Sequence, residues 1–368
     1  MLKNRVFVNY FDALSCAGLN ERELWQNILN QKSGIKMHSD FLPDAKAAIG
    51  KIDSAASFKE LLLDFAQNAF MQSGTEPKDC VLFAGSSVGG MQNTEKKLQE
   101  GADFSDIDPN FHTIETIKNT LNLRFSFKEN FAFSTACTSS ANALGFAYEC
   151  IKKGVYERAL VIGADALSLT TVCGFNALGI LSDTICAPFC HTSGGMNVAE
   201  GLGLLILSNI KTENAVEILG VGYSSDAYHM THPKPDGKGA FEAMKAALKN
   251  AALDASQIDY INAHGTGTKA NDTTEAEAIV SLFGKTPYIS SSKNIIGHTL
   301  GAAGAIEAII TCKAITQGVI PPNGAIEQSI NEECDFALYP IKREINFAMS
   351  NSFAFGGNNT SLVFGKIL

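Results

Sequence analysis

Short apolar runs alternate with longer segments of helical periodicity along most of this chain, and this alternation limits the possible fold more than any other feature. The runs are typical of buried strands and occur at 81–87, 159–165, 203–209, 216–223, 258–264 and 360–365. Segments with helical spacing lie at 141–154, 241–253, 273–284 and 301–318, and several of them end in glycine. The pattern predicts an α/β protein.

The apolar run at 203–209 lies near the middle of the chain, and no low-complexity linker separates the segments on either side of it. The chain is therefore interpreted as two α/β halves, residues 1–208 and 209–368. Sequence similarity between the halves is too faint to establish a repeat.

Composition excludes several classes of protein. Of the 368 residues, 45% are hydrophobic and only 18% are charged, as in a well-buried globular protein. The formal net charge of −9 argues against nucleic acid or an anionic membrane surface as the main partner, although a local basic patch remains open. With no apolar stretch near the ~20 residues of a membrane span, we expect a soluble protein without membrane insertion.

The cysteines indicate a reducing compartment. There are nine of them, scattered and without CxxC pairs, and the first ten residues, MLKNRVFVNY, lack the apolar run of a secretory signal. We expect a cytoplasmic protein whose cysteines are mostly buried.

Cys137 stands between a strand-like run, FAF, and a helical segment that begins with small polar residues. At a strand-to-helix turn, the positive end of the helix dipole favours thiolate, so we expect a lowered pKa for Cys137. The small neighbours Thr135, Ala136 and Thr138 leave room for a bulky thioester. The alternative is a buried structural cysteine at the start of a helix, and position alone does not decide between them.

Two histidines stand in similar turns. His264 follows a strand-like run and precedes GTGT, whose glycines allow close approach of a ligand and whose threonines can donate hydrogen bonds. We expect the next helix to begin at Asn271 or Asp272, with Glu275 as its capping partner. Lys293 and His298 lie in a second glycine-rich turn before a helix. Loops at strand ends commonly carry catalysis on α/β scaffolds, so these turns predict an active site.

Two other groups have spacings that resemble metal sites: HMTH at 229–232 and CAPFCH at 186–191. Neither has a matching second cluster, so no metal is expected.

Taken together, the motifs resemble those of the β-ketoacyl-acyl carrier protein synthases, which elongate acyl chains in fatty acid and polyketide biosynthesis. The matching elements occur in the order of that family: TACTSS (135–140), PDGKG (235–239), HGTGT (264–268) with NDTTEAEAI (271–279), KNIIGHTLGAAGAIEAI (293–309) and NSFAFGGNN (351–359). The resemblance implies a thiolase-like fold, in which two similar α/β halves stack as five layers (αβαβα), and usually a homodimer.

The resemblance also implies the roles of individual residues. Cys137 would receive the acyl group, and His264 and His298 would bind and activate a second thioester. Lys293 would support the histidines together with Glu307. The second thioester would be a malonyl group on acyl carrier protein, and loss of carbon dioxide from it would drive a Claisen condensation without metal or other cofactor.

Further residues of the resemblance shape the pocket. Thr266 and Thr268 would hydrogen-bond the pantetheine arm, and Phe353 would contact the substrate. Phe355 would gate the acyl pocket, and its backbone N–H together with that of Cys137 would form an oxyanion hole.

The chain departs from the family pattern in several places. It is shorter than typical members, which suggests trimmed loops. Cys190 stands where an Asp often follows Pro-Phe, an arginine that often comes next is absent, and Ala354 replaces a glycine of the gating loop. An Ala there would cost on the order of 1 kcal/mol if the position needs positive φ.

Charge near the expected docking surface also differs. Asp103, Asp106 and Asp108 occur where many members are basic, and like charges would weaken docking of an acidic carrier. Three explanations remain open: an unusual carrier, a basic face on a partner subunit, or docking near basic residues elsewhere, namely Lys59, Arg124 or Lys128.

Three alternative functions remain. In the first, the chain is the ketosynthase subunit of a heterodimer with a partner resembling a chain-length factor. A thiolase-like enzyme using coenzyme A thioesters is less favoured, because thiolases have a second cysteine as base where this chain has histidine. A non-catalytic subunit would be expected to lack Cys137.

Overall fold

The computed structural model describes residues 4–42, 45–324 and 326–367. Within them, eleven strands hydrogen-bond in the order β12-β10-β9-β14-β15-β8-β1-β7-β6-β4-β5. In chain order these strands are β1 (Val6–Ser15), β4 (Val81–Gly85), β5 (Glu129–Phe133), β6 (Arg158–Asp165), β7 (Gly201–Ser208), β8 (Val216–Ser225), β9 (Tyr260–Asn262), β10 (Tyr288–Ser290), β12 (Asp335–Phe336), β14 (Phe347–Phe353) and β15 (Asn358–Lys366). Two further strand pairs are β2 (Lys36–Leu42) with β3 (Ala45–Ile49), and β11 (Val319–Ile320) with β13 (Ile341–Lys342).

The helices connect and cover these strands. They are α1 (Glu21–Leu29), α2 (Phe58–Ser73), α3 (Met91–Gln99), α4 (Glu115–Arg124), α5 (Ser139–Lys152), α6 (Leu169–Ala177), α7 (Lys238–Ala251), α8 (Lys269–Phe283), α9 (Lys293–Ile296) and α10 (Ala303–Gln317). Short 3-10 turns are η1 (Pro77–Asp79), η2 (Phe104–Asp106), η3 (Pro109–Phe111), η4 (Ala255–Gln257), η5 (Leu300–Ala302) and η6 (Phe355–Gly357). No helix in the described part of the chain is long and apolar enough to cross a membrane.

The sheet has two parts of similar arrangement. In the first, β5, β4 and β6 are parallel, and β7 and β1 follow antiparallel. In the second, β12, β10, β9 and β14 are parallel, and β15 and β8 follow antiparallel. Strands β1 and β8 join the two parts over only three residue pairs. The division of the chain into halves after residue 208 stays a prediction.

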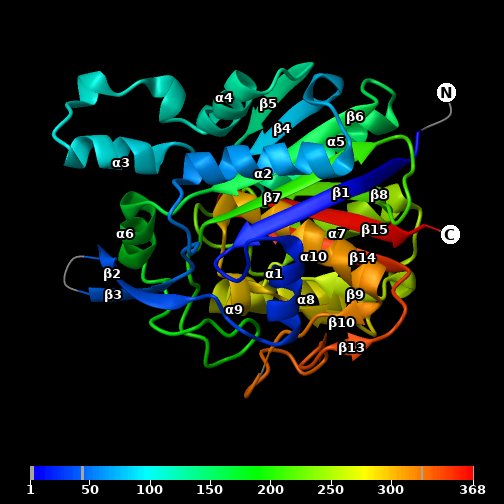
Figure 1. The fold of residues 1–368 in the computed structure, drawn as a ribbon. Coiled ribbons are helices and arrows are strands. Elements are labelled where there is room, and N and C mark those ends of the chain that lie inside the picture. Colours follow the sequence, from blue (N-terminus) through cyan, green and yellow to red (C-terminus); the bar gives the residue numbers. More distant parts are fainter. Residues whose placement is uncertain (1–3, 43–44, 325, 368) are drawn as a thin grey trace.

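Helices separate and cover the two parts of the sheet. Helices α5 and α10 pack against each other between them, and α10 contacts β7 on one side and β14 on the other. Helices α2 and α4 cover the outer face of the first part, and α7 with α8 covers the outer face of the second. In Figure 1, α2 and α4 accordingly lie at the top of the molecule and β10 towards the bottom. Apolar side chains from each of these interfaces form a separate buried cluster.

Each strand and helix predicted from periodicity overlaps an element of the same type. Glycines with positive φ follow three of the predicted helices: Gly154 at 74° after α5, Gly284 at 63° after α8 and Gly318 at 60° after α10, of which Gly318 has the left-handed helical conformation. Helix α10 is buried along most of its length. Glycine at its start lets it approach α5 closely, since a Cβ at Gly304 would lie 2.7 Å from Ala141.

Helix α7 packs so closely on the sheet that a single added methyl group on β8 should destabilise the protein. A Cβ on Gly222 of β8 would lie 2.0 Å from the carbonyl oxygen of Ala243 and 2.3 Å from the nitrogen of Ala247. We expect Gly222→Ala to lower the free energy of unfolding by about 1–3 kcal/mol, measured by chemical denaturation. The matched control is Gly174→Ala on α6, where a Cβ meets nothing within 4 Å; it should leave stability unchanged or slightly raised. Equal stabilities for the two variants would contradict this packing.

Candidate active site

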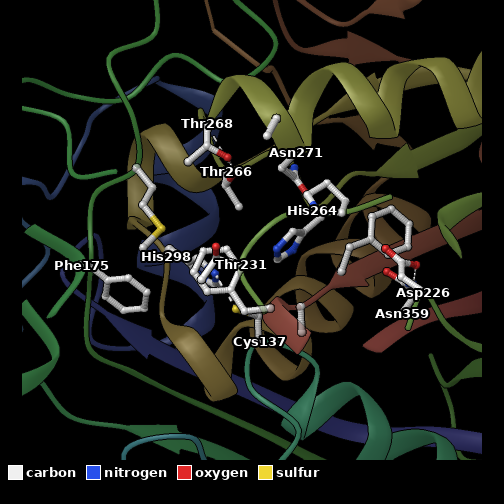
Figure 2. A pocket seen from close by; sticks show the side chains of 16 residues that line it. Cys137, Phe175, Asp226, Thr231, His264, Thr266, Thr268, Asn271, His298 and Asn359 are labelled. Carbon is white, nitrogen blue, oxygen red and sulfur yellow. Dashed lines mark hydrogen bonds between the residues drawn. The ribbon is translucent and has the colours of Figure 1, made fainter. Parts of the chain in front are cut away.

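Cys137 lies in the tight turn between β5 and α5. The residue before it, Ala136, has φ 53°, a conformation that costs a non-glycine residue on the order of 1 kcal/mol. The turn is held by the carbonyl oxygen of Ala136, which accepts hydrogen bonds from the hydroxyls of Ser87 at 2.7 Å and Ser139 at 2.6 Å. The strained turn therefore presents the Cys137 sulfur at the start of α5, facing a pocket (Figure 2).

His298 is the histidine in contact with that sulfur. Its Nε2 lies 3.1 Å from the Cys137 Sγ, and its Nδ1 accepts the backbone N–H of Leu300 at 3.2 Å. Since Nδ1 is an acceptor, the proton of the neutral ring is on Nε2. His298 therefore points an N–H into the pocket. Leu300, with φ 52°, is a second strained non-glycine residue beside the site.

His264 is oriented by a buried lysine. The Lys293 Nζ donates a hydrogen bond of 2.5 Å to the His264 carbonyl oxygen and lies 3.4 Å from its Nδ1. The same amine forms an ion pair with Glu307, and both side chains of this pair are only 1% exposed. With Nδ1 facing a donor, His264 also presents Nε2–H to the pocket. The ring centres of His264 and His298 are 5.3 Å apart, and the two ring planes are nearly perpendicular.

Two carboxylates of α8 hold the HGTGT turn in shape. Glu275 accepts the backbone N–H groups of His264 and Gly265, each at 2.8 Å. Asp272 accepts those of Thr266 and Gly267 at 3.0 and 3.1 Å. The expectation that the helix begins at 271 or 272 was wrong: it begins at Lys269, and both acids fold back onto the preceding loop.

Asp165, at the end of β6, holds the second turn and was missed from sequence. One of its oxygens accepts the backbone N–H of Gly301, within the η5 turn, at 2.6 Å. The other accepts the Ser86 hydroxyl at 2.5 Å and the Val88 N–H at 2.9 Å. This single carboxylate therefore ties the turn that carries His298 to the end of β4.

Burial dominates the electrostatics of the site. It raises the pKa of the Cys137 thiol to about 11, although Lys293 and the backbone N–H groups of Phe355 and Cys137 act in the opposite direction. The expected lowering of this pKa by the helix dipole is therefore wrong in direction. Burial and the nearby Lys293 charge hold the pKa of His264 and of His298 well below the usual value, so both rings are neutral. Burial also raises the pKa of Glu307 to about 7.

The pocket in front of the sulfur brings together the predicted residues. It is lined by Cys137, His264 and His298, and also by Thr266, Thr268, Phe353 and Phe355. The hydroxyls of Thr266 and Thr268 are 2.9 Å apart. Lys293 and Glu307 lie beneath it and do not line it. Sequence reasoning missed several further lining residues, among them Phe175, Met196, Asp226 and Asn359. Phe175 packs edge-on to Phe355 with ring centres 6.1 Å apart.

The loop that follows β14 closes one side of the pocket. Ala354 has φ −107°, so replacing glycine there carries no conformational cost. The positive φ angles belong to Gly356 and Gly357, at 81° and 80°. Asp226 anchors this loop: its backbone N–H donates to the Gly357 carbonyl at 2.9 Å, and its carboxylate accepts the Asn359 side chain at 2.7 Å.

The sulfur of Cys137 and ring nitrogens of His264 and His298 lie within 4.8 Å of one another. Thiolate and imidazole are zinc-type ligands, so these residues could coordinate a metal as well as act as a catalytic set. The expectation that the site works without a metal or cofactor stays a prediction.

The raised pKa of Cys137 gives a testable pH dependence. A thiol with a raised pKa forms its reactive thiolate only at higher pH. We therefore expect the rate of Cys137 alkylation by iodoacetamide to rise still above about pH 9.5. For a thiol of ordinary pKa, about 8.5, this rate has levelled off by that pH. Peptide mass spectrometry assigns the adduct, with Cys137→Ala as control. A plateau below about pH 8 would show that the helix dipole outweighs burial.

Comparison with known proteins identifies the family. Residues 45–213 match the model of the beta-ketoacyl synthase N-terminal domain, and residues 215–327 match that of the C-terminal domain. A putative mitochondrial 3-oxoacyl-(acyl-carrier-protein) synthase from Schizosaccharomyces pombe is 32% identical over 99% of both chains. The 3-oxoacyl-(acyl-carrier-protein) synthase 2 of Coxiella burnetii is also 32% identical, over 100% of both chains.

A solved structure gives the same assignment. A ketosynthase from Xenorhabdus doucetiae, in complex with its chain length factor, superposes with a TM-score of 0.90 at 30% identity, over 99% of this chain and 98% of the other. The predicted thiolase-like α/β fold is thereby confirmed. With both family domains matched and full-length relatives above 30% identity, this chain belongs to the beta-ketoacyl synthase family.

Proposed function

We propose that this protein is a β-ketoacyl-acyl carrier protein synthase, which condenses an acyl group on Cys137 with malonyl-acyl carrier protein in fatty acid or polyketide biosynthesis. The observation that carries the proposal is the convergence of the Cys137 sulfur with two neutral histidines, each presenting Nε2–H to one pocket. Relatives named as synthases of this type support it.

The first step is transfer of the acyl group to the enzyme. The Cys137 sulfur attacks the carbonyl carbon of an acyl-carrier thioester, and the carrier thiol leaves. The proton lost by Cys137 ends on that thiol, so the exchange needs no net acid or base. The backbone N–H groups of Phe355 and Cys137 lie close enough to the Cys137 sulfur to favour its thiolate. An oxyanion hole built from these two groups would hold the negatively charged carbonyl oxygen of the intermediate and stabilise it by roughly 3–4 kcal/mol per donor.

The second step makes the carbon–carbon bond. Malonyl thioester loses carbon dioxide, and negative charge develops on its thioester oxygen as the enolate forms. Nε2–H groups of His264 and His298 donate to that oxygen, and their neutrality matters because a preorganised dipole stabilises the enolate without surrendering a proton. The enolate carbon attacks the acyl group on Cys137, and the sulfur leaves with a proton from solvent.

The pocket lining supports roles for the other predicted residues. Thr266 and Thr268 face the pocket with hydroxyls suited to the amide groups of a pantetheine arm. Phe353 packs against the His264 ring at 6.2 Å between centres and would contact the substrate. Phe355 rests on Phe175, and rotation of Phe355 away from this contact would open the space beyond Cys137 to an acyl chain.

The carrier protein would dock on a surface that differs from the usual one. Asp103, Asp106 and Asp108 are exposed, and each carboxylate accepts a local backbone N–H at the start of a 3-10 turn. These hydrogen bonds stabilise the local turns, so the acids at these positions need no role in carrier docking. Lys59 on α2 and Arg124 at the end of α4 are exposed on neighbouring helices, with Lys128 close in sequence, and offer a basic alternative.

The chain would act as a dimer. Strand β5 ends the order of the main sheet, so its outer edge has no strand partner among the described residues. Phe146 on the adjacent α5 is 47% exposed, and an uncovered apolar group beside a free strand edge suits pairing with a second subunit. The subunit would be an identical copy or, as in the Xenorhabdus doucetiae complex, a chain length factor.

The alternatives are less well supported. A coenzyme A-dependent thiolase would need a second cysteine as base, whereas the groups that face Cys137 among the described residues are His264 and His298. A non-catalytic role does not fit a nucleophile held in a strained turn. We place the enzyme in the cytoplasm as part of the proposal, supported by its nine free cysteines.

Intact-mass spectrometry tests the first step. Incubation with a panel of acyl-carrier thioesters should add one acyl group to the wild type and none to Cys137→Ala. Addition of malonyl-carrier should then release a product two carbons longer. Absence of any adduct on the wild type, with and without a chain-length-factor subunit, would reject the proposal.

Substitution of His264 separates the two steps. His264→Ala removes one donor to the enolate oxygen but leaves the His298 contact with Cys137 intact. We expect acylation to persist while malonyl decarboxylation slows by about 10²–10³-fold. His191→Ala, which alters an exposed histidine that does not line the pocket, is the control. If acylation and decarboxylation fall together, the assigned role of His264 is wrong.

A further inference from the structure

The proposed reaction leaves two histidines at the mouth of the pocket unused. His229 and His232 belong to the HMTH segment in the loop between β8 and α7, and both are exposed. Thr231, which lies between them in sequence, lines the same pocket as Cys137 (Figure 2). This loop therefore combines potential metal ligands on its outer side with a contact to the catalytic space on its inner side.

The ring nitrogens of this pair have the spacing of metal ligands. The Nδ1 atoms of His229 and His232 are 3.3 Å apart. Two imidazole nitrogens, each bonded to Zn²⁺ at 2.0–2.1 Å with a tetrahedral angle, stand roughly 3.3 Å apart. The Thr231 hydroxyl completes a triangle, 3.0 Å from the Nδ1 of His232 and 3.4 Å from that of His229. Three polar atoms thus surround one point on the exposed side of the loop.

One of the two nitrogens is an acceptor, so its lone pair is available for exchange with a metal ion. The backbone N–H of Thr231 donates to the Nδ1 of His229 at 3.2 Å, so in the neutral ring this nitrogen is the acceptor. The Nδ1 of His232 lies 3.3 Å from this nitrogen. A metal bound by both rings would displace the Thr231 N–H from the His229 lone pair and replace that hydrogen bond by a coordinate bond.

The loop is shaped before any ion binds. Asp226 accepts the backbone N–H of Lys234 at 3.0 Å and so closes the loop at its base. Ala227 holds φ 47°, a conformation that sets the direction of the chain just before the histidines. Because the scaffold is fixed at both ends, little order has to be gained when a ligand binds.

We propose that His229 and His232 form a binding site for a divalent transition-metal ion of the zinc type, with water completing its coordination, and that the bound ion restrains the mouth of the pocket. The link to the pocket is direct. The backbone N–H of Gly356, next to Phe355, donates to the Met230 carbonyl at 2.8 Å, and Met230 lies between the two histidines in sequence. An ion that locks this segment would also hold the loop that carries Phe355.

Calorimetric titration with ZnCl₂ tests binding. Because Cys137, His264 and His298 are themselves a possible zinc set, the titration uses both the wild type and Cys137→Ala. We expect both proteins to bind one ion per chain at this site with the same affinity. His232→Gln, made in each background, should weaken that binding at least tenfold, and His191→Gln should leave it unchanged. Matching melting curves establish that the variants are folded.

The outcomes separate the two places where zinc could bind. Unchanged affinity in His232→Gln would overturn the proposal, as would loss of binding in Cys137→Ala alone, which would assign the ion to the catalytic set. The effect on the pocket is read from the rate of Cys137 alkylation, which zinc should slow in the wild type and not in His232→Gln. Equal slowing in both would remove the link between the ion and the pocket. None of these readouts depends on condensation, so a failure here is distinct from a failure of the proposed function.

Discussion

The buried ion pair between Lys293 and Glu307 is the interaction on which the rest of the site depends. Both side chains are almost fully excluded from solvent, and removal of one partner from such a pair typically costs 3–5 kcal/mol because the other is left as an uncompensated charge. The pair is not an obvious source of stability, since its desolvation offsets much of its attraction. Its value is positional: it fixes the amine beneath His264 and thereby fixes the tautomer and direction of that ring.

Buried carboxylates perform a related task for the surrounding backbone. Asp165, Asp272 and Glu275 each accept two or more N–H or O–H groups, including groups of the turns that carry His264 and His298. Burial raises the pKa of these acids, to about 6 for both aspartates and about 7 for Glu275. Burying each charged carboxylate is therefore unfavourable, and its hydrogen bonds offset part of that unfavourable free energy. The gain is a set of rigid turns whose dipoles need no rearrangement during the reaction.

Much of this could be predicted from sequence, for identifiable reasons. Buried strands such as β4, β6 and β7 are continuous apolar runs, and Cys137, His264 and His298 each stand in a turn of small residues, so local pattern was enough to find them. Strand β1 was missed because polar residues interrupt its half-exposed middle. The role of Asp165 depends on a partner 136 residues away, and the pKa of Cys137 depends on how deeply the folded chain buries it. A local sequence pattern contains neither the distant partner of Asp165 nor the depth at which Cys137 is buried.

The central claim is that two neutral histidines, both protonated on Nε2, face the sulfur of Cys137. Nitrogen-15 NMR of histidine-labelled protein tests it most directly, with His264→Ala and His298→Ala used to assign the two rings. Both rings should show the Nε2–H tautomer and remain neutral to well below the usual histidine pKa, because burial and the Lys293 charge disfavour the imidazolium. An imidazolium at neutral pH, or a proton on Nδ1 of either ring, would contradict the account.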